Sequence, residues 1–260
     1  MTGVDVTYGF GYDKISLSSR FAHAEPACMS PLAAYDALAP FYSSLLEARK
    51  EYLTRIEDII TAQARGALSL LDIGSGNGVR ALRIAGVCGI DRLVLVEPSD
   101  GMRRESPKNS AVWLRSTSEI SEAARFELIT CLWNVLGYVD GARERSALLS
   151  KLKAFLGPSG MLFIDVNHRY NAGSYGWGKT AARIMHDYLL PSEKNGDVIA
   201  SWQAGQQRIR TRGHVFTNAE LLRLFQSAGL RIKNRWIIDY RNGTQHRFAI
   251  FGNLLYQLTA

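Results

Sequence analysis

The stretch Leu70-Leu71-Asp72-Ile73-Gly74-Ser75-Gly76-Asn77-Gly78 decides the fold of this 260-residue chain. It begins as an apolar strand, reaches a carboxylate at Asp72 and then turns through three glycines. Nineteen positions after Gly78, a second apolar strand, 93–96, ends at Glu97. A glycine-rich turn after a first strand lets the backbone approach a nucleotide-like ligand, and an acid that ends the second strand can hold ribose hydroxyls. The stretch therefore predicts a nucleotide-type site on an α/β sheet.

Two details of the stretch select the kind of nucleotide. The dinucleotide fingerprint Gly-x-Gly-x-x-Gly requires glycine where this chain has Val79. The carboxylate of Asp72 would repel a pyrophosphate and attract an ammonium group, and S-adenosylmethionine carries an ammonium group and no phosphate. Residues 72–78 resemble the first motif of the class I S-adenosylmethionine-dependent methyltransferase family. An NAD-linked oxidoreductase is therefore the weakest alternative.

The resemblance extends over residues 35–258 and implies a Rossmann-like, seven-stranded, mostly parallel sheet with helices on both faces and an antiparallel last strand. Strand and helix patterns alternate along the chain, which predicts right-handed βαβ units. We expect strands at 68–73, 92–97, 111–115, 126–132, 160–166, 231–239 and 247–258. We expect helices near 46–64, 78–86, 99–105, 118–124, 141–156 and 177–189, and a turn at 157–160. A further helix starts at Pro31, and Pro40 must kink or split it.

Two segments break this rhythm. Residues 1–30 show no clear period, and we expect a lid or a flexible segment there. Residues 167–216 combine a helix pattern with two strand-like runs, which predicts an inserted helix and a β-hairpin after the fifth strand. We assign residues 31–260 to a methyltransferase domain. The resemblance implies that its N-terminal helices cover the cofactor and that the insertion 167–216 caps the substrate pocket.

The resemblance also assigns cofactor-binding residues position by position. The motif that receives the methionine part of the cofactor is matched by Asp72, Gly74, Ser75, Gly76 and Gly78. The acid that binds both ribose hydroxyls is Glu97. The other predicted contacts flank the adenine or follow the third and fourth strands: Pro98, Ser99, Met102, Ser116, Thr117, Trp133 and Asn134. The family often has Asp where Ser116 stands, so the contact to the adenine amino group is assigned to Ser116 or Thr117.

Polar residues at the carboxyl ends of the fourth and fifth strands supply the catalytic candidates, because ligands of open α/β sheets sit there. Asn134 follows the fourth strand and is hard to explain as a core residue, because a buried amide needs partners. His168 follows the fifth strand and is the predicted general base, since imidazole titrates near neutral pH. A loop histidine that faces water is the alternative for His168. His214, at the end of the predicted hairpin, is the second histidine candidate.

Bulk composition fits a globular enzyme. Hydrophobic residues make up 47% of the chain and charged residues 21%, as in a protein with a sizeable core. No apolar run is long enough to span a bilayer, and we expect no signal peptide. Cys28, Cys88 and Cys131 are too few and too widely spaced for a disulfide framework or a zinc site. They predict a reducing, cytoplasmic location and no metal centre.

Charge is distributed unevenly along the chain. Residues 1–166 carry 18 Lys/Arg and 19 Asp/Glu, whereas residues 167–260 carry 13 Lys/Arg and 5 Asp/Glu. Arg208, Arg210 and Arg212 alternate, so they share one face of a strand. This excess favours an acidic small molecule or a nucleic acid as partner, with a solvated basic face as the alternative. No membrane partner is expected, and the hairpin suggests a homodimer.

The sequence predicts an enzyme that moves a methyl group from S-adenosylmethionine to an O or N atom of a small molecule by in-line displacement. One alternative is methylation of RNA or protein through the basic last third. The absence of the Asn/Asp-Pro-Pro-aromatic tetrapeptide after the fourth strand counts against amino methylation of nucleic-acid bases. A second alternative is a protein that binds the cofactor without catalysis.

Overall fold

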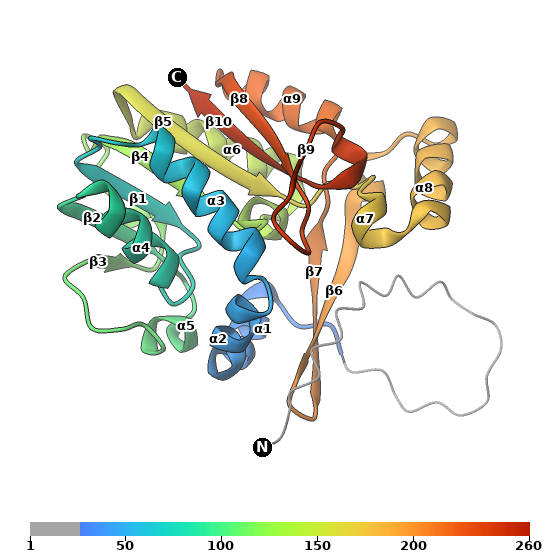
Figure 1. The fold of residues 1–260 in the computed structure, drawn as a ribbon, viewed down its shortest axis with the longest axis horizontal. Coiled ribbons are helices and arrows are strands. Elements are labelled where there is room, and N and C mark those ends of the chain that lie inside the picture. Colours follow the sequence, from blue (N-terminus) through green and yellow to red (C-terminus); the bar gives the residue numbers. More distant parts are fainter. Residues whose placement is uncertain (1–26) are drawn as a thin grey trace.

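A central sheet of eight strands organises the computed structural model, which describes residues 27–260 (Figure 1). From one edge to the other the strands are β3 (Val112–Leu114), β2 (Arg92–Val96), β1 (Ser69–Ile73), β4 (Phe126–Cys131), β5 (Leu156–Val166), β10 (Asn253–Thr259), β8 (Arg231–Ile238) and β9 (Gln245–His246). The pairs from β3 to β5 are parallel, and β10 is antiparallel to both of its neighbours. The expected Rossmann-like sheet is confirmed, with the two-residue strand β9 added at its edge.

The strand order reverses between β1 and β4. From β1 the chain steps outward through β2 to β3, and then returns to place β4 on the other side of β1. All five residues of β1 are buried, as expected for a parallel strand covered on both faces. Such a reversal leaves a crevice at the carboxyl ends of the strands, where α/β proteins bind ligands.

Helices cover both faces of the sheet (Figure 1). On one face lie α3 (Lys50–Gln63) and α4 (Val79–Cys88), and on the other lie α6 (Gly141–Ala154) and α9 (Asn218–Ser227). Ile56 and Ile84 belong to the core on the first face, and Leu149 and Leu221 to the core on the second. Each fully buried leucine or isoleucine contributes about 2 kcal/mol of transfer free energy, so both layers are firmly attached.

The N-terminal cover comprises three short elements: α1 (Pro31–Leu38), η1 (Ala39–Phe41) and α2 (Tyr42–Glu47). Pro40 splits the helical segment, as predicted. Met29 tethers the start of α1 to β7 (Gln207–His214), because its N–H donates to the Arg210 carbonyl at 2.8 Å. Asp36 tethers α1 to α5 (Asp100–Arg104), where it accepts from the Gly101 N–H at 2.8 Å. The predicted lid lies almost entirely outside the described residues.

The segment between β5 and α9 contains the expected insertion. Its elements are α7 (Ala172–Tyr175), α8 (Trp177–Leu189), η4 (Glu193–Gly196), β6 (Asp197–Ala204) and β7. Strands β6 and β7 form an antiparallel hairpin that extends from the sheet toward α1 (Figure 1). The helix and the hairpin are therefore confirmed, and the hairpin approaches the N-terminal cover.

Four sequence-based boundaries were wrong. The helix expected at 118–124 is only the turn η2 (Thr117–Glu119), because the chain is already extended at Ile120. The helix expected at 46–64 is split between α2 and α3, and η5 (Ala249–Phe251) occupies the start of the strand expected at 247–258. The turn expected at 157–160 is part of β5. Gly160 allows this close pairing, since an added Cβ would lie 2.8 Å from the Phe126 carbonyl oxygen.

Candidate active site

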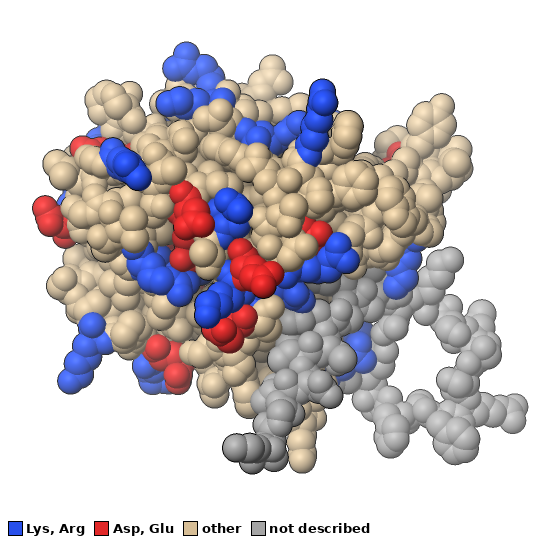
Figure 2. Space-filling view, viewed as in Figure 1, with Lys and Arg blue, Asp and Glu red and all other residues tan. Residues whose placement is uncertain are grey.

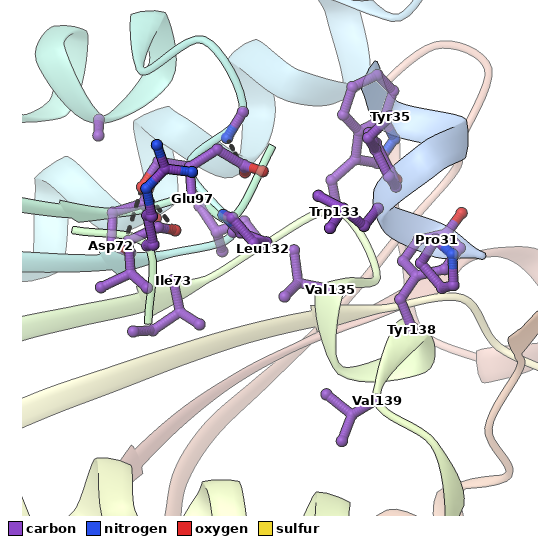
Figure 3. A pocket seen from close by; sticks show the side chains of 18 of the residues that line it. Pro31, Tyr35, Asp72, Ile73, Glu97, Leu132, Trp133, Val135, Tyr138 and Val139 are labelled. Atoms are coloured by element: carbon purple, nitrogen blue, oxygen red, sulfur yellow. Dashed lines mark hydrogen bonds between the residues drawn. The ribbon is translucent and has the colours of Figure 1, made fainter. Parts of the chain in front are cut away.

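A cavity of about 390 Å³ lies at the carboxyl ends of β1, β2 and β4. Figure 3 shows Asp72 and Glu97 at one end of it, and Tyr35, Trp133 and Tyr138 at the other. We call these the cofactor end and the acceptor end, after the roles that we propose for them below. Predicted cofactor-binding residues that line the cavity are Asp72, Gly74, Ser75, Gly76, Glu97, Pro98, Ser116 and Trp133.

The glycine loop is packed too closely for side chains. Gly74 has φ +68°, and an added Cβ would lie 2.5 Å from a methyl group of Val135. Gly76 has φ +58°, and its Cβ would lie 2.7 Å from the Tyr42 hydroxyl. Both positions need glycine for conformation and for space, so the loop presents backbone to the cavity.

Asp72 ends β1 as a buried carboxylate at the cavity wall. It accepts a hydrogen bond from the Thr130 hydroxyl at 2.6 Å. Burial raises its pKa from 3.8 to about 6, against the opposing effects of Thr130 and the nearby Arg80. A buried carboxylate whose ionised form is destabilised is suited to a cationic ligand group, because the ligand compensates the lost hydration.

Glu97 follows β2 and faces the same end of the cavity. Its two carboxylate oxygens accept from the Gly76 and Ser99 N–H groups, both at 2.8 Å. Burial raises its pKa from 4.5 to about 7. A carboxylate has about four acceptor positions, so two stay available for hydroxyl donors. The donor and acceptor set at this end therefore fits the ammonium group and the ribose of S-adenosylmethionine.

The acceptor end is aromatic, and the sequence did not reveal it. The Tyr35 ring lies 5.4 Å from the Tyr138 ring and 6.0 Å from the Trp202 ring, measured between centroids. These three residues come from α1, from η3 (Val135–Tyr138) and from β6. A smaller adjoining cavity, about 30 Å³, is lined by the same rings together with those of Tyr42, Trp133 and Tyr240. We call it the aromatic chamber. Tyr35 is one of the apolar residues that recur at helical spacing after Pro31, a pattern typical of core residues. The sequence alone therefore gave no reason to place it in a site.

Asp165 is a buried carboxylate beside Trp133 that was not among the residues predicted from the sequence. It is buried near the end of β5 and accepts from the Tyr52 hydroxyl at 2.5 Å and from the Trp133 N–H at 2.9 Å. Trp133 and Asn134 both have positive φ, +58° and +62°. Such conformations are unfavourable for non-glycine residues, so Asp165 helps to hold the turn that directs Trp133 into the cavity. The sequence signal that could have identified Asp165 is its position, because it is a carboxylate near the end of a predicted strand.

Five predicted cofactor residues do not line the cavity: Gly78, Ser99, Met102, Thr117 and Asn134. Gly78 begins α4 with φ +75°, and Met102 is fully buried. The Asn134 amide borders the aromatic chamber, and both of its polar atoms are engaged. It donates to the His214 carbonyl at 3.1 Å and accepts from the Asn167 N–H at 3.0 Å. Asn134 thus joins three chain segments, and its amide is committed to the backbone.

His168 lies away from the cavity and does not face water. It is 4% exposed, and its Nδ1 is 2.9 Å from the Ala249 carbonyl oxygen. Burial lowers its pKa from 6.5 to about 4. Both sequence interpretations, the base at the site and the solvent-facing loop histidine, therefore differ from the observed position. The buried imidazole lies between β5 and η5, and its lowered pKa favours the neutral form near pH 7.

His214 is part of a buried charge cluster. Its ring nitrogens lie 2.8 Å from Asp197 Oδ1 and 2.7 Å from Glu220 Oε1. Arg169 adds a contact to Glu220 at 2.8 Å and one to Asp187 at 3.1 Å. The cluster connects the insertion to α9. His214 is therefore not brought to the cavity either.

Within residues 27–260, no three side chains of the types His, Cys, Asp and Glu are grouped so that they could hold a metal ion. None of the helices in the same range has the length and apolarity needed to cross a bilayer.

Comparisons with known proteins agree with this geometry. A family model described as a methyltransferase domain matches residues 42–234. The dTDP-3-amino-3,6-dideoxy-alpha-D-glucopyranose N,N-dimethyltransferase of Streptomyces fradiae is 24% identical over 237 residues, which span 82% of this chain and 91% of that protein.

Solved structures share the fold. An S-adenosylmethionine-dependent methyltransferase from Clostridium acetobutylicum ATCC 824 has a TM-score of 0.57 at 14% identity, over 86% of this chain and 98% of that one. The DhpI–SAM–HEP complex has a TM-score of 0.62 at 15% identity, over 89% of this chain and 96% of that one. Because the family model matches most of its length, this chain belongs to the class I S-adenosylmethionine-dependent methyltransferases, and S-adenosylmethionine is its cofactor.

Proposed function

We propose that this enzyme methylates a small molecule, at an O or N atom, with an amine nitrogen favoured. The observation that carries the proposal is the cover over the acceptor end. Tyr35, Tyr138 and Trp202 meet there from three separate elements and close this end with aromatic rings, which supports an acceptor of limited size. The similarity to a sugar N,N-dimethyltransferase supports the same substrate class.

The residues of the cofactor end are assigned three roles. Asp72 holds the ammonium group, Glu97 holds the ribose hydroxyls, and the loop 74–78 surrounds the methionine part with backbone. The bound cofactor supplies an electrophilic methyl group on a sulfonium. The contribution of the protein is to align the acceptor atom with that methyl group and to exclude water, which the aromatic rings do.

The preference for nitrogen rests on proton transfer. A hydroxyl acceptor needs a base within reach, whereas an amine that arrives neutral needs only correct placement. Among the described residues that line the cavity and the aromatic chamber, none is histidine or lysine. The carboxylates at the cofactor end are assigned to the cofactor. An amine acceptor is therefore favoured, because its methylation does not require a general base among these side chains.

The insertion and the N-terminal cover are assigned to acceptor binding. Within the proposed domain 31–260, α1 supplies Tyr35 and the hairpin supplies Trp202 to the wall of the site. We infer that 167–216 is the acceptor cap. If the sheet binds the cofactor and these two segments bind the acceptor, the residues at the acceptor end are expected to come from outside the sheet.

Methylation of RNA or protein has less support. Basic residues of the last third lie on two different sheets, for example Arg210 on β7 and Arg235 on β8. On the face shown in Figure 2, acidic and basic side chains are interspersed. This face presents no continuous basic surface for a phosphate backbone.

Calorimetric titration of the full chain with S-adenosylmethionine and its demethylated product, with NAD as control, tests the cofactor site. Micromolar binding of the first two and none of NAD is expected. An acceptor screen with paired amines and alcohols then tests the preference for nitrogen. Methylation of alcohols alone would contradict that preference. RNA binding that weakens steeply with salt would contradict the small-molecule assignment.

A further inference from the structure

Arg80 is a buried arginine in the wall of the cavity that none of the roles assigned above uses. It is the second residue of α4 and follows the last glycine of the loop, Gly78, by two positions. Its side chain is only 10% exposed. Arginine is seldom buried to this extent unless its charge is paired, so its position at a ligand cavity needs an explanation.

Glu57 of α3 holds one side of Arg80. The Nε atom of Arg80 donates to Glu57 Oε1 at 3.2 Å, and Nη2 of Arg83 donates to the same oxygen at 2.9 Å. Glu57 is buried, whereas half of the Arg83 side chain is exposed. One carboxylate is therefore shared by two guanidinium groups, and one positive charge of this group stays uncompensated.

One terminal nitrogen of Arg80 lacks a partner in the part of the chain that the structure describes. Its Nη2 atom is buried and forms no hydrogen bond with any of the residues 27–260. A buried donor without an acceptor destabilises a protein, and the effect is larger for a charged group. Because Arg80 lines the cavity, a ligand bound there can supply the missing acceptor.

Asp72 and Arg80 bring opposite charges to the cofactor end. Burial raises the pKa of Asp72, and the positive charge of Arg80 opposes this rise, so the two groups act on one another. The other arginine of the cavity wall, Arg115, is exposed and pairs with Asp100 at 2.8 Å. A wall with one anionic and one cationic group suits a zwitterion. A ligand with a cationic group alone would leave Arg80 unpaired.

We propose that Arg80 binds the carboxylate of the methionine part of S-adenosylmethionine, beside the ammonium group that is assigned to Asp72. This inference rests on the cofactor end as proposed above and adds a residue that selects for the intact amino-acid group. Guanidinium groups bind carboxylates through charge-assisted hydrogen bonds, which gives orientation as well as affinity. Glu57 then acts as a positioning residue, because it holds Arg80 from the side of α3.

The experiment is calorimetry on the full chain with S-adenosylmethionine and with decarboxylated S-adenosylmethionine, which differs only by the missing carboxylate. We expect the unaltered chain to bind the first ligand about 30-fold more tightly, the value of one charge-assisted hydrogen bond. Arg80→Gln should weaken the binding of S-adenosylmethionine by a similar factor. It should weaken the binding of the decarboxylated ligand less than threefold.

Arg83→Gln is the matched control, because Arg83 pairs with the same Glu57 oxygen and does not line the cavity. It should change the affinity for either ligand less than twofold. Arg80→Lys is a second test variant, which keeps a positive charge beside Glu57 and loses the planar guanidinium. It should also reduce the preference for S-adenosylmethionine, and it keeps the inference testable if Arg80→Gln does not fold.

A loss of preference that is confined to the Arg80 variants supports the inference. Equal weakening of both ligands in these variants overturns it, because a purely structural role of Arg80 would affect them alike. Equal affinity of the unaltered chain for the two ligands, or an equal loss of preference in Arg83→Gln, also overturns it. Failure of the unaltered chain to bind either ligand would overturn the proposed cofactor end itself, and this inference with it.

Discussion

The two ends of the cavity are built in different ways. The cofactor end comes from one continuous stretch, residues 72–97, and consists of backbone and two buried carboxylates. The acceptor end is assembled from α1, η3 and the hairpin, and consists of aromatic side chains. The first is a local motif on the sheet, and the second depends on long-range packing. Ligand recognition at the two ends should therefore respond independently to substitution.

The largest effect is expected from Glu97→Ala. It removes the two carboxylate oxygens assigned to the ribose hydroxyls, and affinity for S-adenosylmethionine should fall about 100-fold, the value of one or two charge-assisted hydrogen bonds. Isothermal calorimetry measures this loss. Asp91→Ala, at an exposed carboxylate before β2, should leave the affinity unchanged. Equal affinity for both variants would remove Glu97 from the site.

Tyr138→Ala tests whether a change at the acceptor end leaves cofactor binding unaffected. It removes a ring that lines the cavity at the ends of β1, β2 and β4 and also lines the aromatic chamber. We expect kcat/KM for an acceptor found in the screen to fall about 20-fold, with the Kd of S-adenosylmethionine within threefold. Trp177→Ala, at an exposed ring of α8, is the control. A loss of cofactor affinity as large as the loss of kcat/KM would show that the two ends are not separate.

The pH dependence of cofactor binding tests the buried carboxylates. Burial raises the pKa of Asp72 to about 6 and that of Glu97 to about 7, and the cationic cofactor requires ionised carboxylates. Affinity should therefore fall as pH decreases from 7 to 5, by about tenfold per unit below each pKa. Calorimetry in matched buffers measures the slope. A flat profile would contradict the assignment of these acids.

Asp72→Asn should separate stability from function. The folded-state pKa is above the ordinary value, so ionisation of Asp72 opposes folding and stability decreases as pH rises from about 4 to about 6. The amide keeps an acceptor for Thr130 without the charge. We expect it to raise the free energy of unfolding at pH 7 by about 2 kcal/mol while weakening cofactor binding. Urea titration at pH 4 and pH 7 measures the first effect, which should vanish at pH 4.

The smallest effect on catalysis is expected from His168→Asn. The side chain is buried and its pKa is lowered to about 4, so it is neutral during turnover. The amide can retain the hydrogen bond to Ala249. We expect kcat to change less than threefold and its pH profile to keep its shape. A large loss of kcat with an altered profile would return His168 to the catalytic candidates.

The sequence predicted what depends on local order. Asp72, the glycine loop and Glu97 form one motif, and their contacts follow from its spacing. The structure does not bring the two candidate histidines to the cavity, because position after a strand does not determine the direction of a side chain. His168 turns toward η5, and His214 joins the charge cluster around Glu220. Trp202 and Tyr35 are 167 positions apart in the sequence, so no local pattern joins them.

The tethers of α1 also have a consequence for the timing of turnover. Met29 holds the start of this helix to β7, and Asp36 holds it to α5 through Ser99 and Gly101. Any motion that lifts α1 from the cavity has to break both sets of hydrogen bonds. The residence time of the demethylated cofactor should therefore reflect one cooperative opening of α1. Weakening either set of hydrogen bonds should shorten this residence time.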